Sequence, residues 1–228
     1  MKPDVLKQLN EDRAEKRPVV LATNLTSGDQ KLLYPADAEG QSEIEAGARA
    51  VFASDKPATI ETVDGPVFLN VFNPPLRMIV VGAVHISQAL APMAKLAGYQ
   101  VVVVDPRGAW ATAERFPGVD LVDEWPDDAM EQLKPDRRTA VVTLTHDPKL
   151  DDPALAAALK SDAFYIGSLG STRTHAKRLQ RLERLGFTEQ DMTRIHGPIG
   201  LSIGAKSPAE IAVSIMGQIT QDLRQEAA

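Results

Sequence analysis

The sequence lacks cysteine, long blocks of Lys and Arg, and apolar runs of membrane-spanning length. Without cysteine the 228-residue chain cannot form disulfides, hold zinc or an iron–sulfur cluster through thiolates, or use a thiol as nucleophile or persulfide carrier. With 25 basic and 31 acidic residues its formal net charge is −6, which disfavours nucleic acid and anionic membranes as partners. We therefore expect a small-molecule ligand.

The first residues also lack the apolar core of a signal peptide. Residues 1–17 form a charged, amphipathic run instead, and we expect a soluble, cytoplasmic protein. The length suits one large or two small domains, with ample chain to bury a core.

Residues 1–75 are predicted to form a small α+β domain. Glu45 follows Ser42 by three residues, as in a capping box that starts a helix, and Asp64-Gly65 is typical of a hairpin turn. Residues 73–75, Asn-Pro-Pro, resemble a linker. The expected helices cover residues 3–16 and 42–54, and the expected strands 19–25, 31–34, 59–63 and 67–72.

Residues 76–228 alternate between apolar strands and amphipathic helices. Such alternation predicts a Rossmann-like, doubly wound parallel sheet of α/β class with helices on both faces. Ligands of such sheets bind outside the carboxyl ends of the strands. The expected strands cover residues 78–81, 100–104, 119–122, 139–143, 163–166 and 193–196. The expected helices cover residues 85–97, 112–116, 126–133, 153–160, 172–185 and 207–224.

The turn after the first of these strands begins at Gly82 and leads into a helix at His85. A dinucleotide-binding fingerprint has glycine where this chain has Val84 and Ser87. Because the branched side chain of Val84 would lie where a pyrophosphate approaches, tight NAD or FAD binding in the usual pose is disfavoured.

Asp105 and Arg107 follow the second strand. Asp105 lies 23 residues after Gly82, about where a ribose-binding acid belongs, but an Asp before proline is equally typical of a turn. Arg107 has the planar donor group that contacts anionic ligands, although a salt bridge to Asp105 or Glu114 is at least as good an interpretation.

The fourth strand is followed by Thr145-His146-Asp147. These residues offer a hydroxyl, an imidazole and a carboxylate at the ligand-binding edge. The alternative is that they only cap the next helix before Pro148. No two histidines have the i, i+4 spacing of a metal site, so metal binding is not expected.

The fifth strand ends in a loop with Gly167, Ser168, Gly170 and Ser171 that opens directly into a helix. Glycines three apart, with hydroxyls and a helix N-terminus, are typical of an anion-binding cradle made of backbone N–H groups. The helix that follows carries one basic face, which is either solvated or holds a polyanion. Its members are Arg173, Lys177, Arg181 and Arg184.

The last loop contains Pro198, Gly200 and Gly204. Its small and rigid residues allow close backbone approach to a ligand or to a neighbouring chain. Ser207, Pro208 and Glu210 then give a strong helix start.

Taken in order, these segments resemble the XdhC/CoxI family of accessory proteins for xanthine dehydrogenase and carbon monoxide dehydrogenase type molybdenum enzymes. The resemblance covers roughly residues 76–224. It is carried by residues 81–85, 105–107, 114–117, 145–147, 151–155, 165–171, 197–204 and 207–215.

The resemblance implies an accessory chaperone that binds molybdenum cofactor, or molybdopterin, and assists its insertion into a xanthine dehydrogenase-type molybdenum hydroxylase, without catalysis of its own. It also implies a homodimer and contact with a cysteine desulfurase. Gly82 and His85 belong to the implied cofactor edge. The implied phosphate site is Gly167, Ser168, Gly170 and Ser171, and the implied ring-orienting residues are Asp105, Arg107, Thr145, His146 and Asp147. Loop 198–204 would close over the cofactor or meet the partner.

The chain departs from the family pattern in two places. Val84 stands where the family commonly has glycine, and residues 1–75 lack the usual Gly/Ser-rich loop that ends in cysteine. Two rivals therefore remain: an NAD(P)-dependent oxidoreductase with Asp105 on the ribose and His146 as acid/base, and a scaffold that has kept the fold but lost the ligand site.

Overall fold

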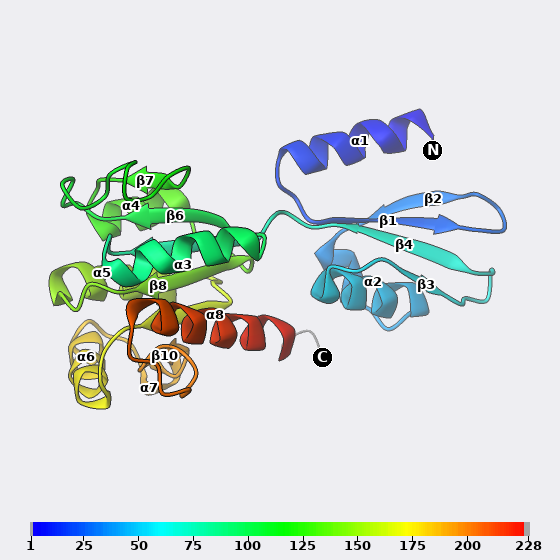
Figure 1. Cartoon of the computed structure of the whole chain (residues 1–228). Coiled ribbons are helices and arrows are strands. Elements are labelled where there is room, and N and C mark those ends of the chain that lie inside the picture. Colours follow the sequence, from blue (N-terminus) through cyan, green and yellow to red (C-terminus); the bar gives the residue numbers. More distant parts are fainter. Residues whose placement is uncertain (1, 226–228) are drawn as a thin grey trace. The chain divides into compact units, whose positions relative to one another are not determined.

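The structure, a computed structural model, describes residues 2–225 and divides the chain into two compact units (Figure 1). The first unit contains the residues up to Pro74, together with Arg224 and Gln225, and the second runs from Pro75 to Leu223. No helix within residues 2–225 is both long and apolar enough to cross a bilayer.

The first unit is an antiparallel sheet in the order β2-β1-β4-β3, with α2 packed on its buried side. The predicted capping box at Ser42 and Glu45 is present and starts α2. Its elements are α1 (Pro3–Ala14), β1 (Val19–Asn24), β2 (Gln30–Leu33), the 3-10 helix η1 (Pro35–Ala38), α2 (Glu43–Ser54), β3 (Ala58–Ile60) and β4 (Val67–Phe72).

The hairpin between β3 and β4 is looser than the Asp-Gly pair predicts. β3 ends at Ile60, three residues before the expected end of its strand. The reason is local: the Thr62 hydroxyl donates to the Gly65 carbonyl at 2.7 Å, and the Gly65 N–H donates to the Thr62 carbonyl at 3.0 Å. These bonds close a four-residue turn over residues 62–65, whose central residues are Val63 and Asp64. The turn is therefore shifted by one residue from the predicted Asp64-Gly65 pair.

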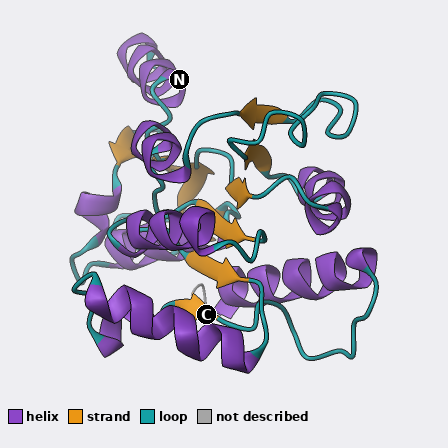
Figure 2. Cartoon of the chain, turned by 90° about the vertical axis from the view of Figure 1, so that its left-hand side faces the viewer, coloured by secondary structure: helices purple, strands orange, loops and turns teal. Residues whose placement is uncertain are grey.

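The second unit contains the predicted parallel sheet of six strands, in the order β10-β9-β8-β5-β6-β7. Figure 2 shows helices on both sides of these strands. The elements are β5 (Arg77–Val81), α3 (His85–Leu96), β6 (Gln100–Val104), β7 (Asp120–Val122), α4 (Pro126–Leu133), β8 (Thr139–Thr143), α5 (Pro148–Leu159), β9 (Tyr165–Ser168), α6 (Thr172–Arg184), α7 (Glu189–Met192), β10 (Ile195–His196) and α8 (Pro208–Gln225).

The core lies on both faces of the central strand β5. Met78 and Val80 pack with α3 and α8 on one face, whereas Ile79 and Val81 pack with α4, α5 and α6 on the other. All four side chains are at most 1% exposed. Each contributes about 1.5–3 kcal/mol by leaving water, which explains why a run of β-branched residues without polar alternation forms this strand.

The sheet order places a topological switch point beside β5. The chain crosses through α3 to β6 on one side of β5, whereas β8 pairs with β5 on the other side. In open parallel sheets the crevice outside the carboxyl ends of two such strands is the usual ligand-binding place.

Two predicted helices differ in the structure, and one helix was not predicted. Residues 112–116 form turns rather than a helix, because the amides of Arg115 and Phe116 share the Thr112 carbonyl and Pro117 follows at once. α5 begins at Pro148, five residues earlier than predicted, since Asp147 caps it. α7 is a single turn with its own cap that the pattern did not reveal.

Candidate functional site

The carboxyl ends of β5, β6, β8, β9 and β10 lie on the same edge of the sheet, because all five strands are parallel. The segments that follow them contain the site residues predicted from the sequence, except Gly167 and Ser168, which lie inside β9. Four of these segments are linked by hydrogen bonds or close packing: the turns after β5 and β6, the Thr-His-Asp turn after β8, and the loop after β9.

Gly82 is required where the first turn meets the turn after β8. Its φ is +113°, and a Cβ at this position would lie 2.6 Å from the Thr145 Cγ2. A side chain would therefore push the two turns apart. The next helix starts at His85, whose side chain is exposed at this edge.

Asp105 is fully buried, and its carboxylate joins the turns after β5 and β6. It accepts a hydrogen bond from the Ala83 N–H at 2.7 Å, and from the Arg107 Nε and Nη2 at 2.8 Å each. For Arg107 the sequence left open a contact to an anionic ligand and a salt bridge to Asp105 or Glu114. The structure contains the salt bridge to Asp105. Burial raises the pKa of Asp105, but the hydrogen bonds from Arg107 and Ala83 outweigh it, and the pKa lies below its usual range.

We expect Asp105→Asn to lower the free energy of unfolding by about 1.5–3 kcal/mol at neutral pH, the usual contribution of charged hydrogen bonds. Because the folded-state pKa is depressed, the carboxylate stabilises the fold above its unfolded pKa of about 3.9, and this contribution is lost as the pH falls through the folded value. Urea unfolding of wild type and variant should therefore differ most at pH 7 and converge under acid. A constant difference down to pH 3 would contradict this assignment.

The Thr145-His146-Asp147 turn follows β8. The Thr145 hydroxyl donates to the Asp151 carboxylate at 2.7 Å, and the Asp147 carboxylate accepts the Lys149 N–H at 2.9 Å as the cap of α5. The predicted capping role is therefore confirmed for Asp147, which caps α5. His146 has a φ of 61° and an exposed side chain. A histidine held in this left-handed conformation is uncommon and marks the turn as a functional candidate.

Beneath this turn lies a buried ion pair that the sequence predictions missed. Asp151 and Arg178 are 2% and 1% exposed, and the Arg178 Nη2 lies 3.9 Å from the Asp151 Oδ2. The same Nη2 donates to the Leu169 carbonyl at 2.7 Å. Burial raises the pKa of Asp151 and lowers that of Arg178. The pair ties the turn after β8 to the loop after β9. Its only sequence signal is an acid and a base that each fall on a buried helix face.

The loop after β9 is shorter than the predicted cradle. Gly167 and Ser168 lie inside the strand and are buried, and the hydroxyls of Ser168 and Thr143 are 2.5 Å apart. Since the Ser168 hydroxyl is already paired inside the sheet, Gly167 and Ser168 no longer count as candidate phosphate ligands. Gly170 and Ser171 remain. Gly170 has a φ of +145°, and a Cβ there would lie 3.1 Å from the side chain of Thr174.

Ser171 is exposed and caps α6. Its hydroxyl oxygen accepts the Thr174 N–H at 3.2 Å. The N–H groups of a helix's first turn have no acceptor within the helix and carry the positive end of its dipole. The start of α6 therefore presents donors at the same edge as the other turns, which is the geometry of an anion site.

In the loop after β10, Gly200 is closely packed whereas Gly204 is not. Gly200 packs against α8: a Cβ there would lie 2.4 Å from the Ser214 Oγ, and its N–H donates to the Gln218 Oε1 at 2.7 Å. Pro198 and Gly204 are exposed, and nothing lies within 4 Å of the Cβ position of Gly204. The close approach at Gly200 is thus made to α8, so within this loop the exposed Pro198 and Gly204 are the predicted residues that a ligand or partner can reach.

Residues 78–219, more than half of the chain, match the family described as the XdhC Rossmann domain. The chain belongs to the XdhC family. The matched span begins one residue after the start of β5 and contains the rest of the sheet and all the strand ends described above.

Two curated XdhC-type relatives illustrate the family. The Escherichia coli (strain K12) protein named molybdenum cofactor insertion chaperone PaoD is 32% identical over 148 residues, which covers 65% of this chain and 40% of PaoD. A Bacillus subtilis (strain 168) protein, named as a probable xanthine dehydrogenase subunit, is 31% identical over 162 residues, covering 71% of this chain and 47% of that protein. This XdhC chain thus spans less than half the length of both.

A solved structure is similar in fold over nearly the whole chain. The Bacillus halodurans protein described as a xanthine dehydrogenase aligns with a TM-score of 0.71 and 23% identity, covering 98% of this chain and 67% of that one. At that identity the likeness establishes the fold, including that of the N-terminal unit, and nothing about the ligand.

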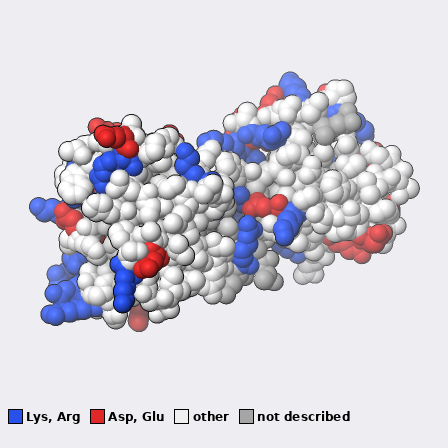
Figure 3. All heavy atoms as spheres, in the orientation of Figure 1, with Lys and Arg blue, Asp and Glu red and all other residues white. Residues whose placement is uncertain are grey.

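In this XdhC protein α6 also carries the predicted basic face, but only three of its four residues are exposed and unpaired with Asp152. Arg181 pairs with Asp152, whereas Arg173, Lys177 and Arg184 are exposed. Figure 3 shows the resulting group of Lys and Arg over α6, at the lower left. Within the described part of the chain, no three His, Asp or Glu side chains gather as they would around a metal ion.

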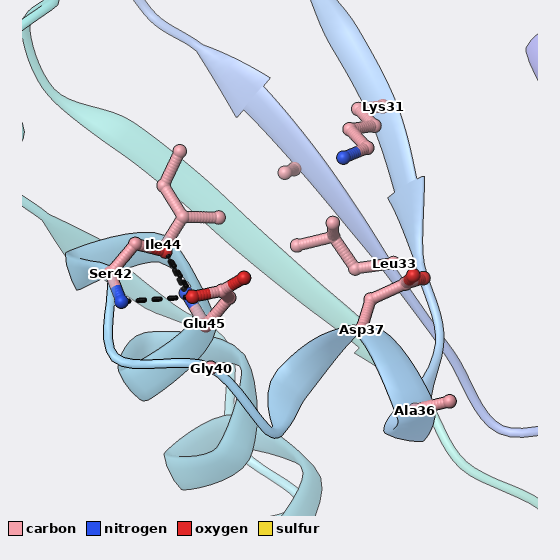
Figure 4. A pocket seen from close by; sticks show the side chains of 9 residues that line it. Lys31, Leu33, Ala36, Asp37, Gly40, Ser42, Ile44 and Glu45 are labelled. Carbon is pink, nitrogen blue, oxygen red and sulfur yellow. Dashed lines mark hydrogen bonds between the residues drawn. The ribbon is translucent and has the colours of Figure 1, made fainter.

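The N-terminal unit has a hollow of about 310 Å³, with Leu33 among its lining residues (Figure 4). Its carboxylates already serve helix starts: Glu45 accepts from the Ser42 N–H at 2.8 Å, and Asp37 accepts from the Tyr34 N–H at 2.9 Å. Because these groups stabilise local structure, the hollow is a weaker ligand candidate than the strand ends.

Proposed function

We propose that this XdhC protein binds molybdenum cofactor at the carboxyl edge of its Rossmann unit and assists its insertion into a xanthine dehydrogenase-type molybdenum hydroxylase. The observation that carries the proposal is the start of α6 at partly buried Gly170 and exposed Ser171, a helix N-terminus at the strand ends within the XdhC-matched span. The names of the relatives support the choice of cargo.

The cargo's phosphate is assigned to Gly170, Ser171 and the first turn of α6. Backbone N–H groups and the helix dipole favour an anion there by electrostatics alone. The phosphate needs no rearrangement of the loop, because Arg178 already holds the Leu169 carbonyl from below. Gly167 and Ser168 support the loop from inside the sheet.

The pterin is assigned to the turns after β5, β6 and β8. Exposed His146, exposed His85 and half-buried Arg107 offer donors and acceptors for a polar ring system. Asp105 acts through Arg107, because its carboxylate is occupied by protein groups. Loop 198–204 closes over the cargo or meets the recipient enzyme.

The proposed role asks for no bond-making by this chain. Without a thiol the protein does not carry sulfur, so a cysteine desulfurase is proposed to act on the cargo while it is bound here. A second copy of the chain and a cytoplasmic location belong to the same proposal. The NAD(P)-dependent alternative has no support from the relatives, and Val84 disfavours the usual dinucleotide pose.

The test is transfer of the cofactor. The chain is purified from a host that makes molybdenum cofactor and mixed with an apo form of the hydroxylase from a strain that lacks this chain. We expect xanthine-dependent dye reduction to appear, and to be absent when the chain comes from a host blocked before molybdopterin synthesis. A cargo-loaded chain that fails to activate the apoenzyme would refute the insertion role.

A further inference from the structure

Trp110 is an exposed tryptophan beside the proposed cofactor site. It is 45% exposed and lies in the segment between β6 and β7. Two guanidinium groups lie near its ring: the Cζ of Arg107 is 5.2 Å, and that of Arg115 5.7 Å, from the ring centroid. A large aromatic left half-exposed between two cations calls for an explanation, because burial of its ring would be favourable.

The segment holds Trp110 in place rather than leaving it on a loose turn. The Trp110 N–H donates to the Arg107 carbonyl at 2.8 Å, and the Arg115 Nη1 donates to the Trp110 carbonyl at 2.5 Å. The Arg115 Nη2 also reaches the Gln88 side chain of α3 at 3.0 Å. The tryptophan is thus anchored both to the end of β6 and to α3.

This corner is linked to the turns at the strand ends. Arg107 is tied to Asp105, which in turn holds the Ala83 N–H of the turn after β5. The pKa of Arg107 is raised, first by its hydrogen bond to Asp105 and to a smaller extent by Asp147 and Asp151. The corner therefore lies within electrostatic reach of the turn after β8 as well.

We propose that Trp110 stacks on the planar ring system of the bound pterin, with the guanidinium groups of Arg107 and Arg115 beside the polar edge of that ring. This inference rests on the proposed function. Aromatic side chains take flat heterocycles in this manner whatever their hydrogen-bond pattern, and neighbouring arginines add charge attraction for an anionic ligand. A purely structural role does not require Trp110 to be 45% exposed at the ligand edge.

The chain provides its own matched control. It has only two tryptophans, and Trp125 is 53% exposed at the start of α4, without either arginine near it. Trp125→Phe therefore leaves Trp110 as the sole emitter, and Trp110→Phe leaves Trp125. Each full-length variant is titrated with pterin-6-carboxylate, and tryptophan emission and pterin anisotropy are recorded.

We expect strong saturable quenching in Trp125→Phe, where the emitter touches the pterin, and much weaker quenching in Trp110→Phe, where only Trp125 emits, outside the proposed stacking contact. From the usual contribution of stacking, Trp110→Ala should bind the pterin roughly ten-fold more weakly than wild type, whereas Trp125→Ala should match wild type. Thermal unfolding of Trp110→Ala checks that the fold persists, and Trp110→Phe, which keeps a stacking ring, should restore most of the affinity.

The outcomes distinguish a failure of the Trp110 stacking role from a failure of the proposed cofactor-binding function. If wild type and Trp110→Ala bind the pterin equally well, the stacking role is refuted and the proposed function stands. If Trp110→Ala keeps the pterin but no longer binds the apo-hydroxylase, Trp110 is a protein-contact residue and the inference is also refuted. If wild type neither binds the probe nor carries pterin from a producing host, the proposed function fails.

Discussion

Replacing Asp151 with alanine is expected to destabilise the protein by about 3–5 kcal/mol, because it removes the strongest counter-charge of the buried Arg178 guanidinium and leaves only the weaker attraction of Asp152. Arg178 cannot lose its proton, and its side chain is only 2% exposed, so water cannot replace the lost carboxylate. The loss is a large share of the 5–15 kcal/mol or so by which domains are stable. Urea unfolding followed by circular dichroism measures it.

Arg178→Met is expected to cost less than Asp151→Ala and to behave differently with pH. Burial already raises the pKa of Asp151, so this carboxyl group can take up a proton once its partner is gone. A group whose folded pKa is raised stabilises the fold below its unfolded pKa, and that contribution is lost as the pH rises through the folded value. The variant should therefore be more stable at pH 5 than at pH 7, relative to wild type.

A matched control lies on the same helix. Arg181 pairs with Asp152 at a partly exposed position, so Arg181→Met should cost only about 0–1 kcal/mol and show no such pH dependence. Equal losses at positions 178 and 181 would contradict the view that the buried pair holds the two turns together.

The second large effect is expected from Ser171→Asp, which should abolish retention of the pterin while preserving the fold. Asp is as good an N-cap as Ser, so α6 keeps its start. The new carboxylate, however, occupies the place where the cargo's phosphate is proposed to bind, and the two negative charges repel each other. The measurement is the fluorescent pterin released by oxidation of protein purified from a producing host, compared with wild type.

Ser42→Asp introduces the same carboxylate at the start of α2 in the N-terminal unit, where the Ser42 hydroxyl likewise accepts a helix N–H, although it also donates to the Glu45 carboxylate at 2.7 Å. Thermal unfolding checks that the variant keeps its fold. This control should retain as much pterin as wild type. Retention by Ser171→Asp at the wild-type level, with the fold intact, would refute the phosphate assignment to the start of α6.

Much of the fold could be predicted from the sequence because its signals are local. The Met78–Val81 run is β-branched and apolar, and Ser207-Pro208 with Glu210 states where a helix begins, so strands and helices alternate visibly. The parallel order follows from that alternation. The prediction of a short helix at 112–116 was wrong. Five residues before a proline form too few helical hydrogen bonds to offset the cost of helix nucleation, so the segment forms turns instead.

The site was harder to predict, because its residues are arranged by packing. The sequence located the strand ends, but nothing local reveals that the Ser168 hydroxyl pairs with Thr143 inside the sheet or that Gly200 approaches α8. Asp151 and Arg178 are 27 positions apart, and a buried pair of this kind is specified by the crossing of α5 and α6. Only the tertiary structure could supply it.

The most direct test of the central claim is the pterin content of the full chain, purified under mild conditions from a host that makes molybdenum cofactor and then oxidised to the fluorescent form. The account predicts pterin in an amount comparable to that of the protein, at wild-type level in Ser42→Asp and at background in Ser171→Asp. Absence of pterin from the wild-type chain, or equal pterin in all three proteins, would contradict it.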